Sequence, residues 1–132
     1  MDIKDLIAGN IVKCKISNDG GIYKVVAIDG YSHKVMLDGA RFKEWISVDK
    51  IKPIPISSKN IILSGGKKHN KKYFFYLNNH EHDVDKISFY VSEGFLCFEG
   101  IKYRSLFKHI SYVHQMQNLY YALTGRDLEC VV

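Results

Sequence analysis

The sequence is poor in proline and cysteine, and it lacks any long hydrophobic run. Two prolines in 132 residues argue against a long disordered linker, because such segments are commonly rich in proline. The three cysteines, Cys14, Cys97 and Cys130, are odd in number and form no CxxC pair, which predicts reduced thiols and a cytoplasmic location. No apolar stretch approaches the ~20 residues that span a bilayer, and the first ten residues do not resemble a signal peptide. We therefore expect no membrane partner.

The sequence also lacks a segment in which charge of one sign is concentrated. The net charge of +5 divides into +3 over residues 1–66 and +2 over residues 67–132, so the chain has no basic tail. A charge this small permits nucleic-acid binding without requiring it.

Motifs of catalysis and phosphate binding are absent. The sequence has no GxSxG or HExxH, and neither Gly20-Gly21 nor Gly65-Gly66 is followed by GK[ST]. The acidic residues are scattered singly, mostly in turns. We expect no catalytic residue, no cofactor and no enzymatic activity.

Residues 1–56 consist of short alternating runs separated by turn residues. The alternation predicts strands and a one-turn 3₁₀ helix before the last strand, the strands over 10–16, 22–29, 33–37, 42–47 and 51–56 and the helix over 48–50. In the first strand Val12 and Cys14 face away from Lys13 and Lys15. Asp38-Gly39 indicates a tight hairpin. The two prolines indicate either that the last strand is at a sheet edge or that they stand at its end. This pattern is typical of a five-stranded SH3-like β-barrel.

Residues 57–132 read as a short helix, an antiparallel meander and a C-terminal helix. Ser57 or Ser58 caps the first helix, expected over 59–64. The strands are predicted over 73–77, 86–91, 95–98 and 101–103. The last helix, 111–124, starts at a Ser111 cap, ends at Gly125, and has an apolar stripe of Tyr112, Met116, Leu119 and Leu123 widened by Val113 and Tyr120. We expect an α+β protein whose two parts, 1–56 and 57–132, share one core.

Three segments of the sequence carry a resemblance. Residues 112–125 (YVHQMQNLYYALTG) are similar to the YVHQLQNLYFALTG ending of an uncharacterised family of small proteins from gut-anaerobe genomes, their phages and mobile elements. Residues 5–10 (DLIAGN) resemble its DLRIGN start, and residues 48–56 (VDKIKPIPI) resemble its ENIEPIPL segment. Residues 59–104 depart from it. The resemblance implies the architecture and a phage or mobile-element setting, and it transfers no site.

A lysine cluster beside aromatic residues is a candidate nucleic-acid site. Lys67, Lys68, Lys71 and Lys72 directly precede the run Tyr73–Leu77. Proteins that bind single strands combine a basic groove with rings on which bases stack. Because side chains alternate between the two faces of a strand, Tyr73 and Phe75 share one face and Phe74 and Tyr76 the other. We expect one pair in the core and the other pair available for bases to stack on. The candidate site is Lys67, Lys68, Lys71, Lys72, Tyr73 and Tyr76; the alternative is a solvated turn beside core rings.

Two further constellations are weaker. His80 and His82 share a face if their segment is a strand and would bind one metal with a third, unidentified ligand; the alternative is a polar loop with solvated histidines. On the last helix, His114, Gln115, Gln117 and Asn118 are expected on a polar face that contacts a partner. The alternative is the ordinary polar face of an amphipathic helix, on which His114 bonds a neighbouring carbonyl. Cys14 and Cys97 are expected to be buried structural thiols, and Cys130 an exposed one.

These features favour a non-enzymatic binding or adaptor module of phage or mobile-element origin, with nucleic acid or another protein as partner. One alternative is a metal-dependent enzyme that uses His80 and His82. Another is a protein that works only as an oligomeric assembly. The sequence leaves the oligomeric state open.

Overall fold

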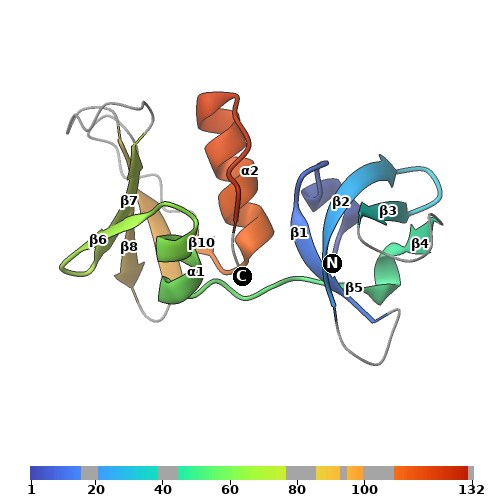
Figure 1. The fold of residues 1–132 in the computed structure, drawn as a ribbon, viewed down its shortest axis with the longest axis horizontal. Helices are drawn as coiled ribbons and strands as arrows, with labels where there is room; N and C mark the ends of the chain where they lie inside the picture. Colours follow the sequence, from blue (N-terminus) through green and yellow to red (C-terminus); the bar gives the residue numbers. More distant parts are fainter. Residues whose placement is uncertain (16–20, 39–44, 77–85, 93–94, 100–108, 131–132) are drawn as a thin grey trace. The chain divides into compact units, whose positions relative to one another are not determined.

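The computed structural model describes residues 1–15, 21–38, 45–76, 86–92, 95–99 and 109–130 (Figure 1). The chain forms two compact units. Unit 1 comprises Met1–Pro55 and Tyr112–Leu119, and unit 2 comprises Ile56–Ser111 and Tyr120–Val132. The chain is an α+β protein whose last helix contributes residues to both units. The shared core expected from the sequence stays a prediction.

Unit 1 contains an antiparallel sheet of five strands in the order β4-β3-β2-β1-β5. Its strands are β1 (Ile11–Cys14), β2 (Ile22–Asp29), β3 (Lys34–Asp38), β4 (Ile46–Ser47) and β5 (Ile51–Lys52). The predicted position of the last strand at an edge is confirmed. It ends at Lys52 because Pro53 has no N–H to continue the ladder.

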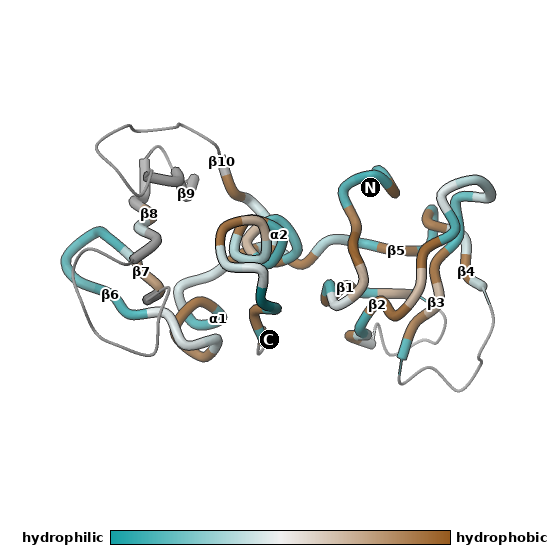
Figure 2. The backbone as a smooth tube through the Cα atoms, turned by 90° about the horizontal axis from the view of Figure 1, so that it is seen from above, coloured by the Kyte–Doolittle hydropathy of each residue, from teal (hydrophilic) through white to brown (hydrophobic). Residues whose placement is uncertain are grey.

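The core of unit 1 follows the alternation of the strands. Val12, Cys14, Val25 and Val35 are fully buried, and Figure 2 marks hydrophobic residues in brown along β1, β3 and β5. The register between β2 and β3 shifts between Val25 and Ala27. Such a bulge adds one residue and resets the alternation, so Val25 pairs with Leu37 and Ile28 with Val35, all on the core side.

Two single-turn 3₁₀ helices flank this sheet, each with a side-chain cap. In η1 (Ile3–Asp5) the Asp2 carboxylate accepts the N–H of Lys4 at 3.0 Å. In η2 (Val48–Lys50) the Ser47 hydroxyl accepts the N–H of Asp49 at 3.4 Å. Both satisfy backbone donors that have no partner inside the helix. The predicted one-turn helix over 48–50 is confirmed to the residue.

Unit 2 contains a second antiparallel sheet in the order β10-β9-β8-β7-β6. Its strands are β6 (Lys67–His69), β7 (Lys72–Tyr76), β8 (Lys86–Ser92), β9 (Phe95–Glu99) and β10 (His109–Ile110). The meander is confirmed for β7, β8 and β9, whereas β6 and β10 were not predicted. The sequence segment of β6 is charged and too short to show a period.

Rings and one short helix fill the core of unit 2. Tyr73, Phe75 and Phe89 are buried, and the rings of Phe75 and Phe89 meet edge to face at 6.2 Å between centroids. Helix α1 (Ser58–Leu63) buries Ile61 and begins with the predicted cap, since Ser57 and Asn60 form a reciprocal capping box.

Helix α2 (Val113–Thr124) differs from its prediction at its start and along its buried stripe. Gln115 accepts the N–H of Tyr112 at 3.1 Å, so the cap is Tyr112 and not Ser111. Val113 and Met116 are buried as expected, whereas Leu123 is 37% exposed. The C-terminus is as predicted: Gly125 has φ of 69° and donates to the carbonyl of Tyr121.

Several predictions fall outside the described residues. They are the turn after Asp38, the part of the 42–47 strand before Trp45, the loop over 78–85 and the strand over 101–103. Within the described part of the chain, no helix is long and apolar enough to cross a bilayer.

A substitution at Gly66 tests the packing between α1 and the sheet of unit 2. A Cβ at Gly66 would lie 2.6 Å from Cγ2 of Ile61 and 2.8 Å from its carbonyl oxygen. We expect Gly66→Ala to lower the free energy of unfolding by about 1–3 kcal/mol, the usual cost of overpacking. Thermal unfolding measures it. Gly30→Ala is the control, because nothing lies within 4 Å of a Cβ at this position. An equal loss of stability in both variants would contradict the close packing at Gly66.

Candidate nucleic-acid interface

The lysine cluster of unit 2 lies on a tight hairpin at the edge of the sheet. Lys68 pairs with Tyr73 and His69 with Lys72, which leaves a two-residue turn of Asn70 and Lys71. Asn70 has φ of 56°, a conformation that asparagine tolerates better than most residues. All four lysines of the cluster are exposed, and Figure 2 shows β6 as a hydrophilic segment. The hairpin therefore presents four cations within six residues.

Tyr73 lies on the core side of this hairpin. Its side chain is only 6% exposed, and the Lys68 ammonium lies 5.5 Å from the centroid of its ring. A cation held over a ring in this way contributes about 0.5–1 kcal/mol at an exposed site. Tyr73 is thus a core residue that positions Lys68, rather than a stacking platform for a base.

The opposite side of β7 carries the rings that remain as candidates. Phe74 is half-buried and pairs with Lys67 on β6 and with Ser88 on β8. Residues directly opposite each other across antiparallel strands share a face, so Lys67 and Phe74 lie on the side away from Tyr73. Tyr76 pairs in the backbone with Lys86, and its side chain is outside the described residues.

The position of these lysines at a sheet edge has a structural consequence as well. β6 is three residues long and ends the strand order. Short edge strands rich in lysine discourage pairing with another chain. Edge protection and phosphate binding both require exposed ammonium groups, so only binding measurements separate the two roles.

The polar residues of α2 lie elsewhere than expected, within unit 1. Gln117 is buried: its side-chain oxygen accepts the N–H of Ile11 at 2.9 Å, and its amide donates to the carbonyl of Gly9 at 3.1 Å. Asn118 accepts from the side chain of Asn10 at 2.7 Å and donates to the carbonyl of Asp5 at 2.6 Å. Asn118 therefore holds its own unit together, and the partner-binding role proposed for it stays a prediction.

His114 is buried, which contradicts its expected place on a solvated face. It is 3% exposed, its ring stacks on that of Tyr112, and its Nδ1 has no hydrogen-bond partner among the described residues. Burial lowers the pKa of His114 and outweighs the opposing effect of the Asp5 carboxylate. The side chain is neutral at pH 7. Gln115, whose side chain accepts the N–H of Tyr112, is half-exposed, as is Asn118.

The cysteines and histidines provide no reactive or metal-binding centre in the described part of the chain. Cys14 is a buried thiol, as predicted, but Cys130 is also buried, which corrects its expected exposure. Burial raises the pKa of the Cys130 thiol, and the hydroxyl of Ser64 opposes the shift. No group of three His, Cys, Asp or Glu side chains suited to a metal occurs among the described residues. His80 and His82 lie outside them.

Comparison with known proteins adds no relative. No protein-family model, no curated protein and no solved structure matches the chain.

The role of Gln117 can be tested by an isosteric change. Gln117→Leu leaves the N–H of Ile11 and the carbonyl of Gly9 without their partner, so we expect a loss of about 1–3 kcal/mol in the free energy of unfolding. Chemical denaturation measures it. Gln115→Leu is the matched comparison, because its bond to the N–H of Tyr112 is exposed, so we expect a smaller loss there than at Gln117. A loss in the control as large as in Gln117→Leu would contradict this role.

The buried state of His114 predicts a pH dependence of stability. Its pKa in the folded protein lies below the ordinary value of 6.5, so the unfolded chain binds a proton more readily. Stability is therefore complete above about pH 6.5 and decreases as the pH falls below it, by at most ~1.4 kcal/mol per pH unit. Denaturant titrations between pH 5 and 8 should show this decrease. It should shrink in His114→Gln and persist in His69→Gln, whose side chain is exposed.

Proposed function

We propose that this chain is a non-enzymatic binding module of phage or mobile-element origin, and that its unit 2 hairpin binds single-stranded nucleic acid. The observation that supports this most directly is the convergence of four exposed lysines on the β6–β7 hairpin. Each ammonium group placed near a backbone phosphate releases condensed counterions, which is the main source of sequence-independent affinity. The buried thiols Cys14 and Cys130 suit the reducing cytoplasm that the proposal includes.

The rings of β7 supply the second component. Phe74 is half-buried on the same face as Lys67, so part of its ring is accessible beside a cation. A base stacked on an aromatic side chain contributes about 1–3 kcal/mol, independent of its identity. Lysines for phosphate and a ring for bases together favour single strands, because bases in a duplex are already stacked.

We further propose that the sheet of unit 1 belongs to an SH3-like barrel. Three features support this: the strand order β4-β3-β2-β1-β5, the bulge at Val26 in β2, and the 3₁₀ helix η2 immediately before β5. A bulge increases the local twist and bends a strand, as is needed to curl a five-stranded sheet. Barrels of this kind bind nucleic acids or peptides through strand faces and loops, which agrees with a binding module.

A salt titration tests the nucleic-acid proposal. We expect the full chain to bind a single-stranded oligonucleotide at ~50 mM salt, with an affinity that falls as salt rises. A triple variant, Lys67→Gln, Lys71→Gln and Lys72→Gln, should reduce the slope of log affinity against log salt by about 2, since each phosphate contact on a single strand contributes ~0.7. Fluorescence anisotropy measures both.

The control removes the same charge from other exposed positions, Lys4→Gln, Lys34→Gln and Lys59→Gln. It should bind with nearly the original slope. Absence of binding at ~50 mM salt would eliminate the proposal, and so would equal losses in the two triple variants, because net charge alone would then explain the affinity.

A further inference from the structure

Unit 1 gathers lysines of like charge on one face of its sheet. Lys13 on β1 stands directly opposite Lys52 on β5, and Lys15 continues the same face two residues further along. All three side chains are exposed, while the residues that alternate with them, Val12 and Cys14, are fully buried. Like charges placed directly opposite each other across strands destabilise a sheet, so folding alone does not favour this arrangement.

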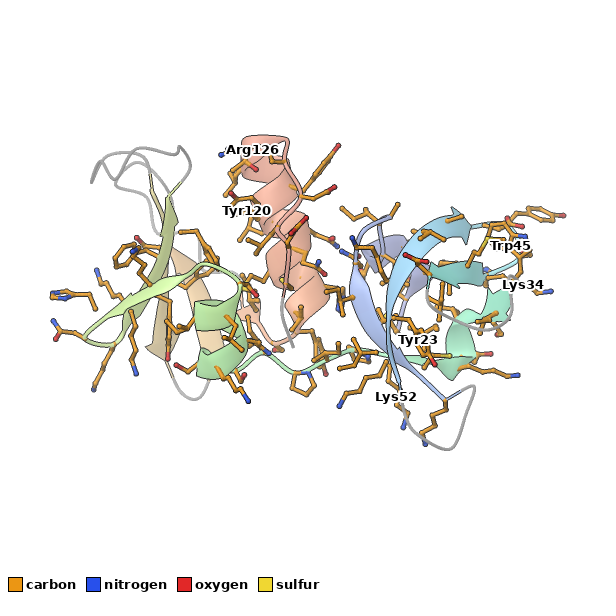
Figure 3. All side chains as sticks on the ribbon, viewed as in Figure 1. Tyr23, Lys34, Trp45, Lys52, Tyr120 and Arg126 are labelled. Atoms are coloured by element: carbon orange, nitrogen blue, oxygen red, sulfur yellow. The ribbon has the colours of Figure 1, made fainter. Side chains whose placement is uncertain are left out.

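The backbone holds these lysines close together. The N–H of Lys15 donates to the carbonyl of Lys50 at 3.4 Å, which extends the pairing of β1 with β5 beyond Cys14. The ammonium of Lys15 is the main cause of a lowered pKa at Lys52, both by direct contact and by charge repulsion. Figure 3 labels Lys52 at this end of the sheet.

Four of the acidic residues that the structure describes in unit 1 have contacts or pairings away from these lysines. Asp2 caps η1, Asp29 accepts from the backbone of Tyr31 and the hydroxyl of Ser32, and Asp49 accepts from Ser47. Asp38 stands opposite Lys24, at the far side of β2 from β1. In the register of the described strands, the residues opposite Lys13 are Ile22 and Lys52, and neither is a carboxylate. The lysines of β1 and β5 therefore face solvent with their repulsion uncompensated within the register.

We infer that Lys13, Lys15 and Lys52 form a second phosphate-binding face, which holds the backbone of nucleic acid through unit 1. The inference extends the proposed function to a second site and rests on it for the class of ligand. Adjacent strands are ~4.8 Å apart, and residues two apart on a strand are ~6.7 Å apart. Successive phosphates of one strand rise by ~3.4 Å along the helix axis, so flexible lysines on this grid can reach neighbouring phosphates.

The three positions that define this face are all lysines. The face therefore lacks the aromatic side chain that the hairpin has beside its lysines. Phosphate contacts position a nucleic acid but read no sequence. The face therefore binds duplexes and single strands alike, with strong salt dependence. An anion that bridges the ammonium groups also removes their mutual repulsion. Loss of this repulsion makes the free energy of binding more favourable.

A double variant tests this face in the full chain with a 20-base-pair duplex. Lys13→Gln with Lys52→Gln should weaken binding at ~50 mM salt by tenfold or more and reduce the salt slope by about 2, since each phosphate contact on duplex DNA contributes ~0.9. Its melting temperature should be equal to or higher than that of the original chain, because a like-charge pair has been removed. Lys52→Gln alone should reduce the slope by about 0.9.

The matched control is Lys4→Gln with Lys34→Gln, two exposed lysines of unit 1 that lie outside β1 and β5. Lys34 stands opposite Asp29, so its removal should not raise the melting temperature. An unchanged slope in the Lys13/Lys52 variant, or an equal decrease in the control, overturns the inference. Binding to phosphatidylserine vesicles without binding to the duplex also overturns it.

The two proposed sites fail separately. In one outcome, the hairpin triple variant loses single-strand binding while the Lys13/Lys52 variant binds the duplex unchanged. This result overturns the second face and supports the hairpin site. Duplex binding that depends on Lys13 and Lys52, with no effect of the hairpin variant on single strands, retains the face and removes the hairpin site.

Discussion

The side chain of Gln117 makes the contact on which the arrangement of unit 1 depends. It satisfies both the N–H of Ile11 and the carbonyl of Gly9, the two backbone groups at the start of β1. Strand β1 lies between β2 and β5, so the position of its first residue sets the register of both neighbours. A buried amide that bonds to both a donor and an acceptor fixes that register, because any slip leaves polar groups unpaired in an apolar environment.

Unit 2 is organised by rings rather than by buried amides. Phe75 meets Phe89 and Tyr120 edge to face, with centroids 6.2 Å and 5.9 Å away. Such pairs favour specific orientations beyond their burial of apolar area. With Tyr73 and Phe75 committed to this core, the residues of β7 that alternate with them are left on the opposite face. The lysines at the edge thus stand beside an aromatic strand because the core uses only one of its two faces.

Acidic and basic side chains of unit 1 have different places. The carboxylates of Asp2 and Asp29 satisfy backbone donors in a cap and a turn, and that of Asp49 accepts from the hydroxyl of Ser47. Lysines occupy the solvent faces and the edge strand instead, so a small net charge of +5 is concentrated locally. This separation explains how a chain with no basic tail has two local groups of exposed lysines, and why net charge alone describes it poorly.

The sequence by itself determined the local elements. Alternation and turn residues gave β2 over 22–29 and η2 over 48–50 with correct bounds, because a strand period and a cap depend on neighbours in the chain. Tertiary structure decided which strands pair, and hence that Lys13 faces Lys52, that Gln117 and His114 are buried, and that Tyr73 belongs to the core. Each of these depends on a partner far away in the sequence, and no local period encodes which distant backbone group a side chain will meet.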